Sequence, residues 1–154
     1  MTAVLSNPVF REPESMGGAI REIEFRDALR EAMSEEMRRD KRVFLLGEEV
    51  AQYDGAYKVS KGMLAEFGER RIIDTPISEP GFTGLGVGAA MTGLRPVIDI
   101  MFGDFLTLVM DQIVNQAAKM KYMFGGSATV PLTITTGGGG GLSAAAQHSQ
   151  SLEA

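Results

Sequence analysis

Short, mostly apolar segments alternate along this chain with longer segments of helical periodicity, and this alternation constrains the fold more than any other feature. The clearest is the continuous apolar run at residues 43–46, and further short strands are expected at 72–74, 97–101 and 131–135. A short run without polar alternation is typical of a strand that is buried on both faces, as in a parallel sheet. Helices that alternate with such strands predict an α/β domain with a mainly parallel sheet flanked by helices.

The segments between these runs carry helical patterns. In the first, apolar side chains recur every four residues and predict an amphipathic helix that ends near Asp40. These side chains are Phe25, Leu29, Met33 and Met37. Further helices are expected over residues 59–67, 82–93 and 105–123. Residues 1–20 are interpreted as a loose N-terminal arm, which leaves 21–154 as the domain.

Composition excludes several classes of function. The chain has 15 Lys and Arg residues against 20 Asp and Glu residues, a formal net charge of -5, so it has no basic surface with which to neutralise nucleic acid. Without cysteine, it cannot form disulfides, thiolate metal sites or a thiol nucleophile. Its one histidine cannot build a zinc site without other ligands, and no metal site is expected on this chain alone. No apolar run is long enough to span a bilayer, and no secretory signal is expected.

In parallel α/β sheets, ligands bind beyond the carboxyl ends of the strands. Polar or glycine-rich segments follow each predicted strand, and we expect the functional site among them. These segments are residues 48–49, 75–79, 102–105 and 137–148.

Two glycine-rich segments invite a phosphate-binding interpretation. Gly84, Gly86 and Ala89 have the spacing of the dinucleotide fingerprint, but no strand runs directly into them, so close helix packing is favoured over phosphate binding. The run 137–141 lacks the Gly-Lys-Ser/Thr sequence of a Walker loop. A mobile or closely approached loop is favoured there over a defined ligand contact.

The ionisable candidates also have structural interpretations. Glu79 lies between two prolines just before a helix, and its position alone favours a solvated carboxylate at the helix N-terminus. Glu48 and Glu49 are favoured as a solvated strand end over an acid–base pair. For His148, which follows the glycine run, functional and structural roles remain equally open.

Several motifs, taken together and in their order, point to a family resemblance. They are FLLGEEVAQYDGAYKVSKG at 44–62, RIIDTPISE at 71–79, GLRP at 93–96 and AQHSQ at 146–150. Over residues 20–154 the chain resembles the beta subunits of thiamine-diphosphate-dependent 2-oxo acid dehydrogenases. Residues 47–57 look most like the pyruvate dehydrogenase beta subunits, whereas 101–102 and 122–126 look more like the acetoin or branched-chain relatives.

This resemblance implies a transketolase-like pyrimidine-binding domain, incomplete because family members continue well beyond this length. It implies thiamine diphosphate as cofactor, held between this subunit and an alpha subunit that grips the diphosphate through magnesium. This chain has no Gly-Asp-Gly diphosphate motif, which agrees with diphosphate binding by the alpha subunit. The implied reaction is oxidative decarboxylation of pyruvate with transfer of the acetyl group to lipoamide.

Other partners implied by the family are a second beta subunit and a lipoyl acyltransferase core. The expected location is a bacterial cytoplasm, or the mitochondrial matrix if the source is eukaryotic. The chain alone is expected to be inactive without the alpha subunit and a C-terminal domain. A branched-chain 2-oxo acid or acetoin dehydrogenase subunit and a non-catalytic assembly module are the alternatives.

The resemblance also implies roles for single residues. Glu79 matches the glutamate that bonds the pyrimidine ring nitrogen and promotes the imino tautomer, Phe105 the aromatic side chain against that ring, and Ile77 a backbone contact. His148 matches the histidine near the substrate and its adduct. The resemblance therefore favours functional roles for both Glu79 and His148. Where relatives usually carry an arginine after the fourth strand, this sequence has Thr135, a departure that bears on loop support or substrate choice.

Overall fold

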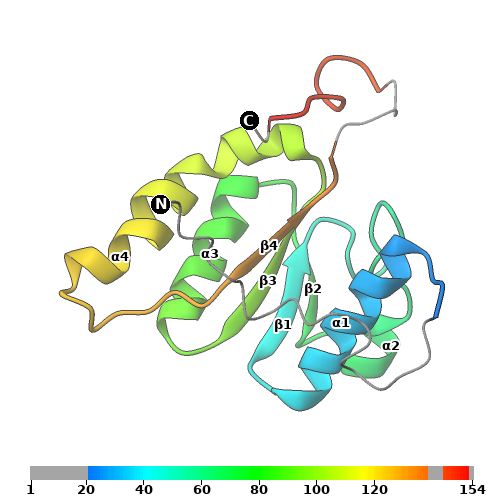
Figure 1. The fold of residues 1–154 in the computed structure, drawn as a ribbon, viewed down its shortest axis with the longest axis horizontal. Helices are drawn as coiled ribbons and strands as arrows, with labels where there is room; N and C mark the ends of the chain where they lie inside the picture. Colours follow the sequence, from blue (N-terminus) through cyan, green and yellow to red (C-terminus); the bar gives the residue numbers. More distant parts are fainter. Residues whose placement is uncertain (1–20, 139–143, 153–154) are drawn as a thin grey trace, which may run out of the picture.

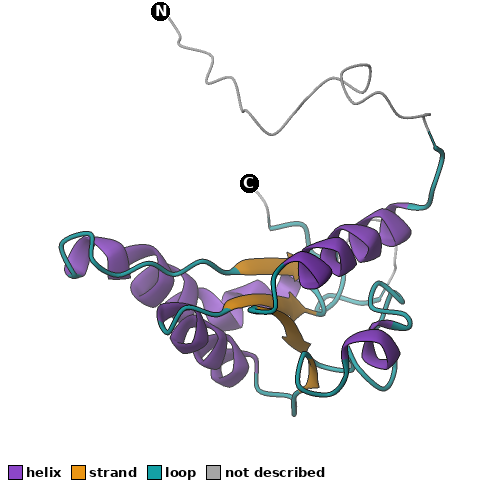
Figure 2. Ribbon diagram, turned by 90° about the horizontal axis from the view of Figure 1, so that it is seen from below, coloured by secondary structure: helices purple, strands orange, loops and turns teal. Residues whose placement is uncertain are grey.

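The computed structural model describes residues 21–138 and 144–152 and shows a four-stranded, fully parallel sheet with the strand order β2-β1-β3-β4. The strands are β1 (Val43–Gly47), β2 (Ile72–Asp74), β3 (Arg95–Ile100) and β4 (Thr133–Thr136). Helices cover both faces of the sheet (Figures 1 and 2). On one side lie α1 (Phe25–Arg39) and α2 (Met63–Phe67), and on the other lie α3 (Glu79–Met91) and α4 (Ala118–Met123). The predicted α/β class is confirmed.

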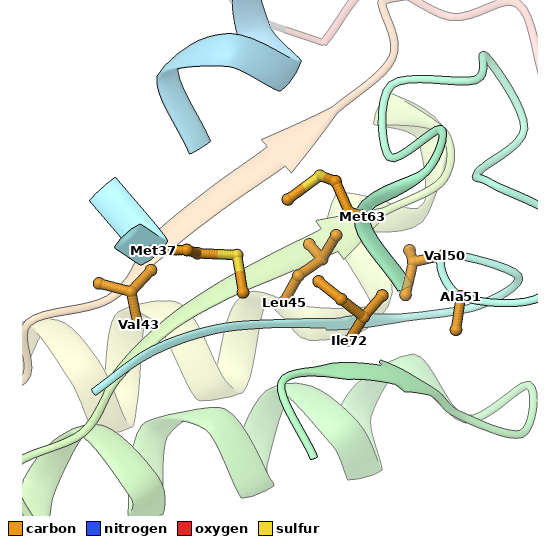
Figure 3. Packing of buried hydrophobic residues seen from close by; sticks show 7 residues of the cluster. All are labelled: Met37, Val43, Leu45, Val50, Ala51, Met63 and Ile72. Carbon is orange, nitrogen blue, oxygen red and sulfur yellow. The ribbon is translucent and has the colours of Figure 1, made fainter. Parts of the chain in front are cut away.

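All five residues of β1 are buried, as the unbroken apolar run predicts. Because successive side chains point to opposite faces, β1 contributes to two cores. Phe44 and Leu46 face α3 and pack with Ile98 and Ile100 of β3. The other core lies under α1 and α2 (Figure 3) and consists of Met37, Val43, Leu45, Val50, Ala51, Met63 and Ile72.

The first helix, α1 (Phe25–Arg39), is confirmed, and Asp40 is its C-terminal cap. Its apolar stripe reaches the core only in the second half. Met37 is buried, whereas Phe25 is 80% exposed at the other end of the same stripe. The N-terminal half of α1 therefore projects beyond the sheet, and residues 1–20 lie outside the described part of the chain.

The first residues of α2 and α3 differ from the prediction. The helix α2 (Met63–Phe67) begins four residues after position 59, because Gly62 adopts a left-handed conformation with φ of 79°, which an α-helix cannot contain. The helix α3 (Glu79–Met91) begins three residues before position 82. Pro80 falls in its first turn, where the missing N–H would have no helical partner in any case.

The predicted helix over 105–123 forms as three consecutive helical segments with different winding. The 3-10 helix η2 (Gly103–Val109) is followed by the π-helix η3 (Asp111–Ala117) and by α4 (Ala118–Met123). Among the described helices, none combines the length and apolar character needed to cross a membrane.

The strand order also locates the ligand edge. From β1 the chain continues to β2 on one side, then crosses back to β3 on the other side of β1. Ligands of open α/β sheets bind at the carboxyl ends of strands where the direction of winding reverses. In this fold the carboxyl ends of β1 and β3 mark that position.

Candidate active site

Glu79 is the first residue of α3, immediately after the segment that leaves β2. The helix dipole favours a carboxylate there, as the sequence predicted. The expectation of a solvated side chain is wrong, since Glu79 is only 7% exposed. A buried carboxyl group costs stability unless it finds a hydrogen-bond partner.

Glu48 directly follows β1 and is buried to the same extent, 7% exposed, whereas Glu49 is exposed. Burial raises the pKa of Glu48, and the carboxylate of Glu79 raises it further, while the N–H of Ser78 opposes both effects. Its Oε1 has no hydrogen-bond partner among the described residues. The solvated interpretation is therefore wrong for Glu48, which forms an acidic pair with Glu79.

His148 lies in an aromatic cluster at the end of β3. Its ring centroid is 4.8 Å from that of Phe102 and 5.4 Å from that of Phe105, and both contacts are edge-to-face. Phe102 and Phe105 contact each other at 5.6 Å, and Tyr57 extends the cluster at 6.2 Å from Phe102. Such pairs fix ring orientation as well as burying apolar surface. The cluster holds the imidazole, half-buried, at the expected edge.

Gly137, at the start of the glycine run, is closely approached by other groups. A Cβ atom there would lie 2.8 Å from Cε2 of Tyr57 and 3.2 Å from the carbonyl oxygen of Met101. The Gly137 carbonyl accepts a hydrogen bond from the N–H of Gly103 at 2.8 Å. The interpretation as a closely approached loop is thus correct at this residue, and residues 139–141 of the run lie outside the described part.

Thr135, the departure from the family pattern, lies within β4 and donates a hydrogen bond from Oγ1 to Oδ1 of Asp99 at 2.7 Å. Burial raises the pKa of Asp99, and the Thr135 hydrogen bond partly offsets this rise. A neutral hydroxyl of β4 is therefore the hydrogen-bond donor to the Asp99 carboxyl group on the neighbouring strand β3.

The predicted site residues form two groups at the same edge of the sheet. Phe105 and His148 are in contact, and Glu79 lies beside Glu48. Ile77 is 84% exposed in the connection between β2 and α3. Across residues 21–138 and 144–152, no hydrogen bond or ring contact joins the groups directly, but α3 packs against both β1 and η2 and so links them.

Comparison with known proteins identifies the family of this domain. Residues 21–154 match the family described as the transketolase pyrimidine-binding domain. The chain belongs to this family. Glu48, Phe102 and Tyr57 lie beside the predicted site residues and are further candidates. From the sequence, Glu48 was interpreted as a solvated strand end, and Phe102 belonged only to a segment that follows a strand. Their position shortly after β1 and β3 was the available signal, and Tyr57 had none beyond its place in the motif at 44–62.

The pyrimidine-binding domain also has close relatives of known name. It is 56% identical over 125 residues to the pyruvate dehydrogenase E1 component subunit beta of Rhizobium meliloti (strain 1021), and 53% identical over 133 residues to the mitochondrial subunit beta of Homo sapiens. The alignments cover 81% and 86% of this chain, but only 27% and 37% of those relatives. The resemblance to these beta subunits is confirmed, and the chain spans a minor part of their length.

The side chains at this edge suit an aminopyrimidine. A carboxyl group can bond a ring nitrogen when either partner carries the proton, and aromatic faces can pack against the ring. The unpartnered Oε1 of Glu48 is a further acceptor. No comparable set of ligands is available for a metal ion. The described residues contain no group of three or more His, Asp or Glu side chains that could hold one.

Proposed function

We propose that this domain supplies the pyrimidine half of a thiamine diphosphate site in a beta subunit of pyruvate dehydrogenase (acetyl-transferring). The assembled enzyme decarboxylates pyruvate oxidatively and passes the acetyl group to lipoamide. The observation that carries the proposal is the buried carboxyl group of Glu79, held at the head of α3 beside Glu48 in a domain of the pyrimidine-binding family.

Glu79 is the central residue of the proposed mechanism. When bound, thiamine diphosphate supplies a thiazolium carbon that can become a nucleophile. The Glu79 carboxyl group would hold the pyrimidine by a hydrogen bond to its ring nitrogen and, following the family pattern, would promote its imino tautomer. A hydrogen bond in a buried site is electrostatically stronger than one in water. Because the pKa of Glu48 is raised, its proton remains bound to higher pH and limits negative charge beside Glu79.

The other site residues orient the reactants. Phe105 packs against the pyrimidine, and the backbone of Ile77 contacts the same ring. His148 would lie near the bound substrate and its adduct, and its contacts with Phe102 and Phe105 support a fixed ring position. These roles follow the family pattern at matching positions.

The proposal assigns the diphosphate and its magnesium ion to an alpha subunit. This chain has no Gly-Asp-Gly motif, and its net charge of -5 does not favour binding of an anionic diphosphate. A second beta subunit and a lipoyl acyltransferase core complete the assembly. The relatives include bacterial and mitochondrial proteins, and we propose a bacterial cytoplasm for this one.

The 154-residue chain alone is proposed to be inactive and to bind the cofactor weakly. One ring contact and one carboxyl hydrogen bond must offset the freedom that the cofactor loses on binding. Calorimetric titration with magnesium and thiamine diphosphate measures this directly. Tight binding together with pyruvate turnover would refute the two-subunit site.

The substrate assignment is tested in a full-length beta subunit that contains this domain, assembled with its alpha subunit. The kcat/KM values for pyruvate, 2-oxoisovalerate and acetoin are compared, and pyruvate is expected to give the highest. The second candidate is a branched-chain or acetoin enzyme, which residues 101–102 and 122–126 favour. It predicts that pyruvate gives the lowest kcat/KM of the three. Assembly without turnover of any of the three would identify a non-catalytic module.

A further inference from the structure

The segment that carries His148 leaves the sheet after β4 and returns to the start of η2 (Figure 1). Two consecutive residues of η2 hold the described residues on either side of 139–143. The N–H of Gly103 donates to the carbonyl oxygen of Gly137 at 2.8 Å. On the return, the N–H of Gln150 donates to Oδ1 of Asp104 at 3.2 Å.

Within residues 144–152 the remaining hydrogen bonds are internal. The N–H of Ala144 donates to Oγ of Ser149 at 2.8 Å, and the side-chain amide of Gln150 donates to the carbonyl oxygen of Ala146 at 2.9 Å. Across the described residues, the bond to Asp104 is the one hydrogen bond that joins this segment to the rest of the chain. The ring contacts of His148 with Phe102 and Phe105 also join this segment to the start of η2.

Asp104 is well suited to serve as an anchor. Its side chain is 6% exposed, and the hydroxyl of Thr107 donates to its carbonyl oxygen at 3.0 Å, which steadies the backbone of η2. Its Oδ2 has no partner among the described residues. A buried carboxyl group with one unused oxygen costs stability, so its presence here indicates a purpose other than packing.

We propose that Asp104 is a positioning residue for His148. Its Oδ1 fastens the backbone two residues beyond the histidine, and the adjacent Phe105 contacts the imidazole. One short stretch of η2 thus fixes both the backbone and the ring. The anchoring stands on the geometry alone, whereas its consequence for turnover rests on the proposed function.

The anchoring is tested by NMR on the 154-residue chain, where His148 is the only histidine and gives a single set of ring signals. In the wild type, ring currents from Phe102 and Phe105 displace these signals from those of an unstructured histidine. In Asp104→Ala the displacement is expected to be lost. Asp104→Asn keeps a carbonyl acceptor and is expected to retain most of it.

Asp111→Ala is the matched control, because Asp111 is exposed on η3 and bonds only to Asn115 among the described residues. Its His148 signals are expected to match the wild type. Backbone amide signals of the sheet report whether each variant is folded. Unchanged His148 signals in folded Asp104→Ala, or an equal loss in Asp111→Ala, would overturn the proposal.

The effect on turnover is tested in the assembled full-length enzyme with a double-mutant cycle of Asp104→Ala and His148→Ala. Each single change is expected to lower kcat while leaving thiamine diphosphate affinity within a few-fold. If Asp104 acts through His148, the double variant is no slower than His148→Ala. Fully additive losses would overturn the positioning role. Normal turnover by His148→Ala would instead refute the proposed function of the histidine and leave the NMR result standing.

Discussion

Gly86 and Gly88 of α3 provide a sensitive test of how the helix packs on the sheet. A Cβ atom at Gly86 would lie 2.5 Å from Cδ1 and 3.0 Å from Cγ1 of Ile98, which is fully buried on β3. At Gly88 no atom lies within 4 Å of the same position. The same substitution in the same helix therefore meets a rigid core in one case and open space in the other.

The magnitudes follow from two opposing effects. Replacing Gly by Ala in a helix interior favours folding by about 0.8–1.0 kcal/mol. Overpacking a well-filled core costs about 1–3 kcal/mol. Gly88→Ala is therefore expected to raise the free energy of unfolding by about 1 kcal/mol. Gly86→Ala is expected to fall below Gly88→Ala by about 1–3 kcal/mol, which leaves it near neutral or destabilised.

Urea denaturation of the 154-residue chain, followed by far-UV circular dichroism, measures both variants against the wild type. Equal stability of Gly86→Ala and Gly88→Ala would contradict this difference in packing. It would mean that α3 does not press on β3, and that the spacing of Gly84 and Gly86 serves some other purpose, such as approach of a ligand.

Two further variants test the site and the core. In Glu48→Gln, stability relative to the wild type is expected to rise as pH increases from about 4, the unfolded pKa of Glu, because the folded wild type holds its proton to higher pH and loses stability above that value. A difference that stays constant with pH, or an equal trend in exposed Glu69→Gln, would contradict this. Arg71→Lys is expected to lower the free energy of unfolding by about 1.5–3 kcal/mol, because the guanidinium donates to the carbonyl oxygens of Met37, Asp40 and Val43. Urea denaturation checks this, with Arg70→Lys as the exposed control, and equal stability of the two variants would be inconsistent with it.

The sequence was sufficient for the α/β class and for the approximate position of each strand, because both depend on local periodicity. The continuous apolar run at 43–46 forms β1, whose side chains are buried on both faces of the sheet. A strand buried on both faces is the simplest explanation of such a run. Boundaries were less accurate where one backbone conformation decided them. The left-handed φ of Gly62, which delays α2, is permitted by the residue type but not dictated by it.

The site could be located but not fully described. Its position followed from the rule that ligands bind beyond strand carboxyl ends, and the family resemblance selected Glu79 and His148. The burial of Glu48 could not be predicted, because it depends on α3 lying beside the end of β1, and a charged pair after a strand is usually solvated. The contact of Phe102 with His148 joins segments far apart in the chain, and local patterns carry no signal for it.

Glu79 is proposed to exchange a proton with a pyrimidine ring, and Glu79→Gln removes that ability. The amide fills the same space but cannot take part in that exchange. In the assembled full-length enzyme, we expect folding and assembly to be preserved and thiamine-diphosphate-dependent decarboxylation of pyruvate to fall by about 10²–10⁴-fold. The exposed control Glu69→Gln should retain wild-type turnover. Near-wild-type decarboxylation by Glu79→Gln would show that this carboxyl group has no part in the proton exchange.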